Sequence, residues 1–227
     1  MCGRFVGFRK LEELKKYIPI DKADFEISEN YNVAPSQEVF SVIKIEALNT
    51  LEKLHWGLVP FWAKDKAIGN KLINARSETA AIKPSFRDAF KKRRCLILAD
   101  GYYEWKGEKG AKQPYFITLP DGSPFVFAGL WETWDNQGQN DTVYKSCTIL
   151  TTEASASIRE IHHRMPVVLE PNVYEAWLDP DKQNVDELQA FFTTDIIRDF
   201  INWPVSKDVN MVKANKPSNI QKTSPEF

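Results

Sequence analysis

Residues 93–105 read Arg-Arg-Cys-Leu-Ile-Leu-Ala-Asp-Gly-Tyr-Tyr-Glu-Trp, and this stretch shows the pattern that organises the whole chain. Its centre, residues 95–99, is an unbroken apolar run with basic residues before it, which is typical of a buried strand. The ionisable side chain of Glu104 follows, between aromatic residues at the end of the run. The segment is therefore a candidate both for the core and for a functional site.

Segments of the same kind recur on both sides of this stretch. Runs rich in β-branched and aromatic residues predict strands or extended pieces at residues 39–45, 54–62, 71–75, 115–119, 125–131, 143–152, 165–169 and 203–206. Turns are predicted at residues 120–122 and 136–138, and short helices at residues 10–18, 84–91, 155–161, 173–178 and 186–192. We therefore predict an α+β fold, with a mainly antiparallel, curled or barrel-like β-sheet core and short peripheral helices.

Composition and charge restrict the class of protein. The chain has 227 residues, 43% of them hydrophobic, which suffices for the packed core of one domain. Lys and Arg (30) balance Asp and Glu (31), so nucleic-acid binding would depend on a local patch of charge. The three cysteines, Cys2, Cys95 and Cys147, lack disulfide-like or zinc-like spacing, which predicts a reducing compartment and no metal. Because no apolar run approaches ~20 residues, we expect a soluble cytoplasmic protein without a membrane span.

The first four residues, Met1-Cys2-Gly3-Arg4, offer a nucleophile that no internal position can provide. An initiator Met is removed when the next side chain is small, and Cys2 would then carry an α-amine beside its thiol. Both groups are nucleophilic near neutral pH with modest help from neighbours. Such an aminothiol captures aldehydes by forming an imine and closing a thiazolidine ring. A cysteine at position 2 also has a structural interpretation as a small hydrophobe.

Four polar motifs flank the predicted strands. They are residues 74–78 (Asn-Ala-Arg-Ser-Glu), 101–105 (Gly-Tyr-Tyr-Glu-Trp), 151–154 (Thr-Thr-Glu-Ala) and 162–166 (His-His-Arg-Met-Pro). Taken singly, each has a structural explanation as a cap, a solvated strand end or an ion pair. Their chemistry emerges only when they are considered together with the N-terminus.

In this order, and with residues 1–4, the motifs resemble those of the SOS-response-associated peptidase (SRAP) family, the domain of abasic-site-processing proteins. The resemblance runs from Cys2 to residues 203–206 and 209–210, and it includes residues 56–60. It implies a single SRAP domain over residues 2–212 with the SRAP fold, followed by a polar C-terminal tail at residues 213–227. We expect the protein to be a monomer.

The resemblance also implies an activity. Members of the family link covalently to abasic sites in single-stranded DNA through the mature N-terminal cysteine, and they remove their own initiator Met. The electrophile is the ring-opened aldehyde of the abasic sugar, and the thiazolidine shields the lesion during the DNA damage response. The expected activities are thus an autopeptidase acting on the Met1–Cys2 bond and a crosslinking, lyase-type reaction at abasic sites. No cofactor is expected, and the protein would associate with the nucleoid when bound to damaged DNA.

Catalytic roles follow from the resemblance together with side-chain chemistry. Cys2 supplies the amine and the thiol. Glu104, flanked by aromatic residues in a partly dry pocket, is expected to have a raised carboxyl pKa and to act as general base and acid. His162 is expected to transfer a proton during sugar opening, and His163 is given no role. Asn74 can donate and accept hydrogen bonds, which suits holding a sugar hydroxyl or ring nitrogen.

A second group of residues is expected to bind DNA. Arg4, Arg76 and Arg164 would clamp phosphates on either side of the lesion, since guanidinium matches phosphate oxygens bidentately. Thr151 is a further phosphate ligand in this scheme, with Thr152 as the alternative.

The aromatic turn adds stacking. Phe61 and Trp62 follow Pro60, which ends strand pairing, so their rings are expected to be exposed and to form a wedge against the bases. Core packing is an alternative for both rings and an equally good one for Phe61. The basic residues 91–94 either extend the surface that binds DNA or form an ordinary solvated face.

Two other functions compete with this interpretation. Class II glutamine amidotransferases also begin with Met-Cys-Gly and use the N-terminal cysteine on an amide, but the Asn-Gly and Gly-Asp elements of their site are absent here. The aromatic residues and arginines alone would also suit a non-covalent single-stranded DNA-binding module.

Overall fold

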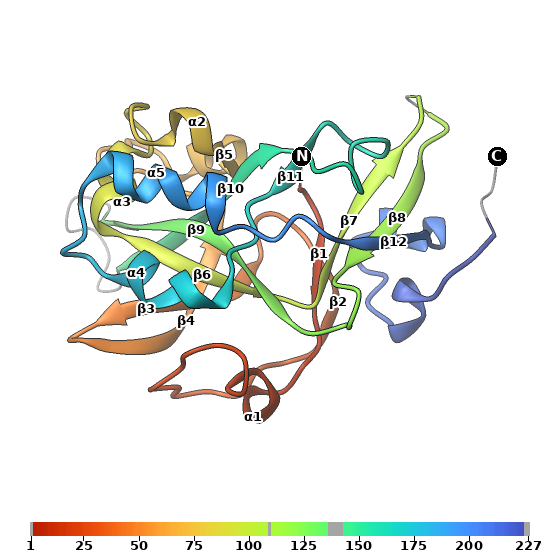
Figure 1. Ribbon diagram of the computed structural model, residues 1–227, viewed down its shortest axis with the longest axis horizontal. Helices are drawn as coiled ribbons and strands as arrows, with labels where there is room; N and C mark the ends of the chain where they lie inside the picture. Colours follow the sequence, from red (N-terminus) through yellow and green to blue (C-terminus); the bar gives the residue numbers. More distant parts are fainter. Residues whose placement is uncertain (1, 109, 136–142, 225–227) are drawn as a thin grey trace.

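The strands form two sheets in the computed structural model, which describes residues 2–108, 110–135 and 143–224 (Figure 1). The larger sheet has the order β11-β10-β4-β3-β6-β9, with β5 also paired to β10, and the smaller has the order β12-β8-β7-β1-β2. The larger sheet contains β3 (Glu38–Ile45), β4 (Leu48–Trp56), β5 (Asn74–Arg76), β6 (Arg94–Ala99), β9 (Phe125–Trp134), β10 (Tyr144–Glu153) and β11 (Arg164–Pro166). The smaller contains β1 (Phe5–Gly7), β2 (Asn30–Val33), β7 (Gly101–Lys106), β8 (Gln113–Thr118) and β12 (Ile201–Pro204).

The larger sheet closes on itself. Strand β9 pairs with β6 on one side and with β10 on the other, and β10 pairs in parallel with β4. The strands β10, β4, β3, β6 and β9 thus form a ring. Within the described residues, the remaining parallel strand pair is β10 with β5, and the other strand pairs are antiparallel. The predicted α+β fold with a mainly antiparallel, curled or barrel-like sheet is confirmed.

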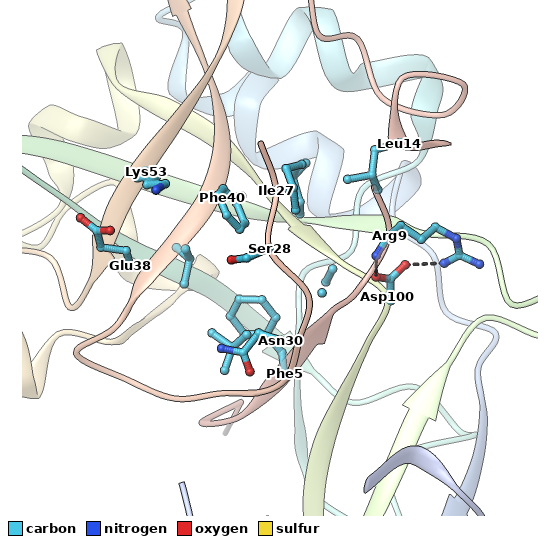
Figure 2. Close-up of a pocket in the computed structure, with 15 residues that line it drawn as sticks. Phe5, Arg9, Leu14, Ile27, Ser28, Asn30, Glu38, Phe40, Lys53 and Asp100 are labelled. Carbon is cyan, nitrogen blue, oxygen red and sulfur yellow. Dashed lines mark hydrogen bonds and ion pairs between the residues drawn. The ribbon is translucent and has the colours of Figure 1, made fainter. Parts of the chain in front are cut away.

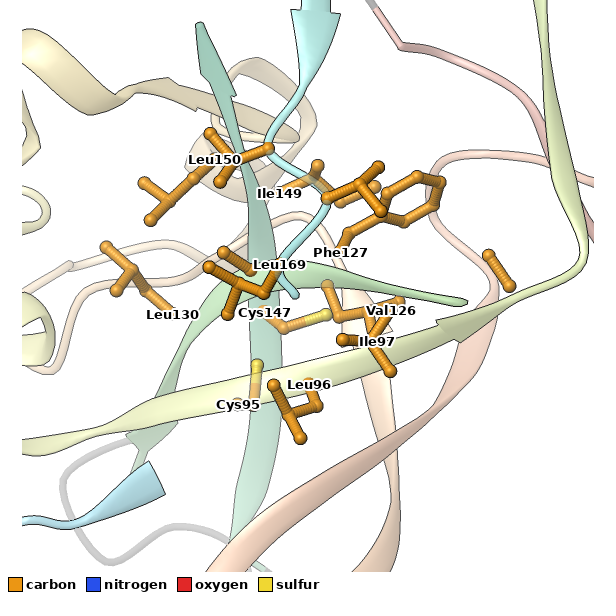
Figure 3. Packing of buried hydrophobic residues seen from close by; sticks show 14 of the residues in the cluster. Cys95, Leu96, Ile97, Val126, Phe127, Leu130, Cys147, Ile149, Leu150 and Leu169 are labelled. Carbon is orange, nitrogen blue, oxygen red and sulfur yellow. The ribbon is translucent and has the colours of Figure 1, made fainter. Parts of the chain in front are cut away.

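Strand β6, which contains the apolar run at residues 95–99, forms part of the wall of this barrel. All six residues of β6 are buried, and Figure 3 shows its side chains packed against aliphatic residues of β9 and β10. Cys95 and Cys147 lie within this packing as free thiols, and burial raises the pKa of each. Thiols held in this way are chemically inert, so the two cysteines contribute to packing.

Short helices flank the two sheets, as predicted. They are α1 (Leu11–Leu14), α2 (Ser77–Ala80), α3 (Arg87–Lys92), α4 (Tyr174–Leu178) and α5 (Val185–Thr194), with 3₁₀ helices η1 (Lys66–Lys71), η2 (Pro171–Val173), η3 (Lys207–Asn210) and η4 (Pro217–Ile220). The longest, α5, begins after Asn184, whose side chain accepts hydrogen bonds from the backbone N–H groups of Asp186 and Glu187. No helix among the described residues is long and apolar enough to cross a bilayer.

Several predicted elements differ in detail. The helix predicted at residues 155–161 is wrong: successive turns occupy this segment, because so short a segment seldom propagates beyond its first bonds. The strand predicted from residue 71 begins at Asn74, since η1 occupies the preceding residues. The helix predicted from residue 84 begins at Arg87. The turn predicted at residues 136–138 lies outside the described residues.

The aromatic turn is held by a close approach of two glycines. Strand β4 ends at Trp56, and Gly57 has φ 139°, a conformation that side chains disfavour. A Cβ at Gly57 would lie 2.8 Å from the carbonyl oxygen of Gly69, so only a glycine fits this close approach. The predicted exposure of Phe61 (55%) and Trp62 (47%) is confirmed, and core packing of these rings is excluded.

The end of the chain packs on the smaller sheet. The indole of Trp203 in β12 donates a hydrogen bond to the carbonyl oxygen of Ile220, and Asn219 is fully buried. Asn32 of β2 donates to the carbonyl oxygens of Met211 and Ala214. The chain between residues 211 and 220, on both sides of the predicted tail boundary at residue 212, therefore lies against structure.

Candidate active site

Strand β1 carries the N-terminal segment to the edge of β7. Phe5 pairs with Tyr102, and the backbone N–H of Tyr103 donates to the carbonyl oxygen of Arg4 at 2.9 Å. Cys2, which precedes β1, lies in the same hydrophobic cluster as Tyr102, and the charge of Glu104 acts on its thiol. In Figure 1, β1 lies at the junction of the two sheets. The pairing thus brings the nucleophile beside the acidic residue that ends the apolar run.

Strand β10 supplies the opposite wall. Its C-terminal half pairs in parallel with β5, where Ile149 faces Asn74, and in antiparallel fashion with β11, where Thr152 faces Met165. The side-chain amide of Asn74 donates a 2.7 Å hydrogen bond to the carbonyl oxygen of Cys2. Residues 2 and 74 are therefore tied together directly, although 72 positions separate them.

Cys2 is fully buried, and Glu104 is only 3% exposed. Burial raises the pKa of the Cys2 thiol, and the charge of Glu104 raises it further. The thiol is consequently protonated at neutral pH and needs a base before it can act as a nucleophile. The dry setting predicted for Glu104 is present, and the carboxylate lies within electrostatic range of the thiol.

His162 forms the third side of the site. Its Nδ1 lies 3.0 Å from both the backbone nitrogen and the carbonyl oxygen of Arg164, so its role as donor or acceptor depends on which ring nitrogen carries the proton. Burial lowers the pKa of His162, although the charge of Glu104 opposes this shift. The ring also stacks on His163 with centroids 4.4 Å apart. His162 is therefore mainly neutral near pH 7 and can accept or pass on a proton.

The predicted phosphate ligand Arg164 lies behind His162. It is 8% exposed, and its guanidinium forms two hydrogen bonds with Glu78, at 2.6 and 2.9 Å, and one with the carbonyl oxygen of Thr151 at 2.6 Å. These bonds lower the pKa of Glu78. Thr151 is itself fully buried and Thr152 is 9% exposed. In this structure, these residues brace the wall behind the site.

The other predicted DNA-binding residues divide into two groups. Arg4 is half-buried and donates to the side-chain oxygen of Asn32 at 2.7 Å and to the carbonyl oxygen of Val209 at 2.6 Å. Arg76, Phe61 and Trp62 are exposed. The exposed residues can therefore contact a ligand without a rearrangement of the structure.

Sequence reasoning missed two structural arginine contacts. Arg94, grouped with residues 91–94 as a possible basic track, is 2% exposed, and its guanidinium donates to backbone carbonyl oxygens, among them those of Trp177 and Phe90. The Arg164–Glu78 pair was also missed, although Glu78 lies in the quoted motif at residues 74–78. The contacts of Arg94 with Trp177 and of Arg164 with Glu78 join residues more than 80 positions apart, so neither has a local signal.

A separate cavity of about 130 Å³ lies between β1, β3 and the end of β6 (Figure 2). Phe5, Leu14, Ile27 and Phe40 line it, and the Arg9–Asp100 ion pair closes one side. The candidate site residues Cys2, Asn74, Glu104 and His162 are not among the described residues that line it. The described residues also contain no group of three or more His, Cys, Asp and Glu side chains that could hold a metal ion.

Comparisons with known proteins identify a family and several relatives of this chain. The family model described as SOS response associated peptidase (SRAP) matches residues 1–212. The chain is similar to the abasic site processing protein YoqW of Bacillus subtilis, at 41% identity over 97% of this chain and 99% of that one. It is also similar to the abasic site processing protein YedK of Escherichia coli, at 31% identity over 97% and 99%. A crystal structure of a Bacteroides thetaiotaomicron protein shares the fold with TM-score 0.83 and 24% identity, covering 98% of this chain and all of that one.

Proposed function

The chain belongs to the SOS response associated peptidase (SRAP) family, and from this premise we propose that it processes abasic sites in DNA by forming a covalent crosslink through Cys2. Relatives that match nearly the whole chain are named abasic site processing proteins. The crosslink is a thiazolidine with the ring-opened sugar of an abasic site in single-stranded DNA. It shields the lesion while the DNA damage response proceeds.

The chemistry balances with the groups present. Once Met1 is removed, the α-amine of Cys2 adds to the C1′ aldehyde and water leaves, which gives an imine. The thiol then adds to the imine carbon, and its proton ends on the nitrogen. No oxidant, metal or cofactor is required. An internal cysteine cannot complete this sequence because it has no free amine.

The observation that supports the proposal is the hydrogen bond from Asn74 to the carbonyl oxygen of Cys2, whose buried thiol is also within electrostatic range of the buried Glu104 carboxylate. Asn74 is proposed to fix the Cys2 backbone and so to hold the amine and the thiol near the acid–base groups. Glu104 takes a proton from the amine or thiol and returns it when the adduct reverses. His162, neutral because of its burial, transfers a proton as the sugar ring opens.

The same group of residues, Glu104 and His162 beside Cys2, is proposed to hydrolyse the Met1–Cys2 bond. A carboxylate and a neutral imidazole beside one peptide bond are suited to activating a water molecule. Mass spectrometry of the intact wild-type chain and a Glu104→Gln variant tests this step. Loss of one Met in the wild type, with retention in the variant, is expected. Equal removal in both would assign the cleavage to another enzyme.

The crosslink itself is tested by incubating the processed protein with a single-stranded oligonucleotide that carries one abasic site. A heat-stable adduct that forms without borohydride is expected, and an undamaged oligonucleotide of the same sequence serves as the control. Two other outcomes would overturn the proposal. Glutamine-dependent ammonia release without an adduct would indicate an amidotransferase, and salt-labile binding alone would indicate a non-covalent DNA-binding module.

The DNA track is proposed to follow the exposed residues around the site. Arg76 extends from the end of β5, next to Asn74, and is exposed. Arg4, Arg164 and Thr151 are proposed as further phosphate ligands, and the buried Arg164 and Thr151 must be uncovered before a phosphate can reach them. A phosphate that binds Arg164 must compete with the Glu78 carboxylate for the hydrogen bonds of the guanidinium group.

Arg76→Ala is expected to weaken DNA binding and to reduce the slope of log K against log salt by roughly 0.7, because one phosphate contact fewer releases fewer counterions from a single strand. Fluorescence anisotropy at several salt concentrations measures the slope. Lys22→Ala, which removes one exposed positive charge from the loop before β2, serves as the control. An unchanged slope in Arg76→Ala would remove this residue from the track.

Trp62→Ala is expected to cost about 1–3 kcal/mol of single-strand affinity, since the loss of one stacked base has this magnitude. Because Trp62 is 47% exposed, the stability of the fold should change little. The matched control is Ile82→Ala, which removes another exposed apolar side chain (72%). If both variants lose affinity equally, stacking is not the cause.

A further inference from the structure

Two adjacent tyrosines in β7 have contrasting hydroxyl groups. Tyr102 and Tyr103 are both fully buried, and they project from opposite faces of the strand into different hydrophobic clusters. The hydroxyl of Tyr103 donates a 2.9 Å hydrogen bond to the carbonyl oxygen of Tyr31. The hydroxyl of Tyr102 has no hydrogen-bond partner among the described residues.

Packing does not explain the Tyr102 hydroxyl. The ring makes edge contacts with Phe127 and Phe200, at centroid distances of 6.1 and 6.2 Å, and a phenylalanine would make the same contacts. A buried hydroxyl without a partner loses its hydration and gains nothing in return. Ser41 and Thr148 also bury hydroxyls without a partner, but such short side chains can turn to nearby backbone groups, which a phenol cannot.

The position of Tyr102 supplies a reason for the hydroxyl. Glu104 lies two residues further along β7, and side chains two apart in a strand project from the same face. Tyr102 also pairs with Phe5 of β1, three residues after Cys2. Burial raises the pKa of Tyr102, and negative charge on Glu104, or on Cys2 when its thiol is ionised, raises it further. The phenol therefore lies within electrostatic range of both reactive groups and keeps its proton as a neutral donor.

We propose that Tyr102 is a positioning residue that donates a hydrogen bond to the Cys2 sulfur while the thiazolidine ring closes. This inference rests on the proposed function. In the closing step, Glu104 takes the thiol proton, the carbon–sulfur bond forms as the imine double bond opens, and the nitrogen receives the proton. Tyr102 keeps its own proton and stabilises the negative charge that develops on sulfur in this apolar site. The unpartnered hydroxyl thus acquires its partner during the reaction.

Tyr102→Phe tests the inference because it removes one oxygen atom and keeps the ring. The rate of heat-stable adduct formation on an abasic oligonucleotide is expected to fall about tenfold or more, as for the loss of a hydrogen bond to a developing charge. The imine should then accumulate, so that adding borohydride increases the trapped adduct in the variant and not in the wild type. Affinity for an oligonucleotide with a tetrahydrofuran abasic analogue, which lacks the aldehyde, should be unchanged.

Tyr103→Phe is the matched control on the same strand. It removes a hydroxyl that has a structural partner, so its denaturation midpoint should fall while its adduct rate stays at the wild-type value. Tyr102→Phe should show the reverse, with an unchanged or higher midpoint and a lower rate. A wild-type rate and no borohydride effect in Tyr102→Phe would overturn the role of Tyr102 alone. Absence of any adduct in the wild type would overturn the proposed function and this inference with it.

Discussion

Cys2→Ala, expressed and processed to a free N-terminus, is expected to give no heat-stable adduct with abasic single-stranded DNA. The variant keeps the α-amine, which can still form an imine with the aldehyde, but it has no thiol to close the ring. Borohydride should therefore trap some imine in this variant, whereas wild-type adduct should survive heating without it. Denaturing gel electrophoresis with and without borohydride distinguishes the two products.

Cys147→Ala provides the control for Cys2→Ala. Cys147 is also a fully buried, free thiol with a raised pKa, but it lies in the barrel wall and its amine is part of a peptide bond. The substitution should cost about 1 kcal/mol of stability through lost packing, and adduct formation should continue. A heat-stable adduct in Cys2→Ala without borohydride would show that another residue is the nucleophile.

Glu104→Gln is expected to slow adduct formation by roughly 10²-fold or more, the usual contribution of a general base. The amide fills nearly the same volume and can still form hydrogen bonds, but it cannot take the proton from the buried amine or thiol. Binding to the tetrahydrofuran oligonucleotide should remain close to the wild-type affinity, because Glu104 is buried and makes no proposed phosphate contact. Single-turnover rates and anisotropy measure the two quantities separately.

A second buried carboxylate serves as the control for this variant. Glu132 in β9 is 4% exposed and pairs with Arg93 at 2.6 Å, outside the proposed site. Glu132→Gln should lower stability because it weakens a partly buried ion pair, while the adduct rate is unchanged. If Glu104→Gln instead lost DNA affinity and kept a normal single-turnover rate, Glu104 would be a binding residue and the assigned proton transfer would be wrong.

The burial of the nucleophile explains why several groups are needed around it. A thiol in an apolar pocket keeps its proton, and the negative charge of Glu104 strengthens this tendency. The resting protein is thereby protected from oxidation and from stray electrophiles. Activation is proposed to occur only when a base, a hydrogen-bond donor and an aldehyde meet at the same place. In this proposal, Glu104 is the base, Tyr102 is the hydrogen-bond donor, and the abasic sugar provides the aldehyde.

Local sequence patterns determined much of this protein. The apolar run at residues 95–99, the β-branched segments and the short helical stretches predicted an antiparallel, curled sheet, because burial and strand periodicity are properties of neighbouring residues. Pro60, which ends strand pairing, predicted the exposed aromatic turn for the same reason. The candidate nucleophile could also be identified from the sequence, since an N-terminal aminothiol depends only on the presence of a cysteine at position 2.

Only the tertiary structure decided which polar groups meet. Arg164 pairs with Glu78 across 86 positions, and Arg94 holds backbone carbonyl oxygens more than 80 positions away, as with Trp177. These partners depend on the register of β5, β10 and β11 and on the closure of the barrel, which no local pattern encodes. The pairing of β7 with β1 and β8 likewise leaves the Tyr102 hydroxyl without a hydrogen-bond partner among the described residues. The type of each side chain is known from the sequence alone. The groups that it contacts depend on the pairing of strands far apart in the chain, so only the folded chain shows which side chains can act together at the site.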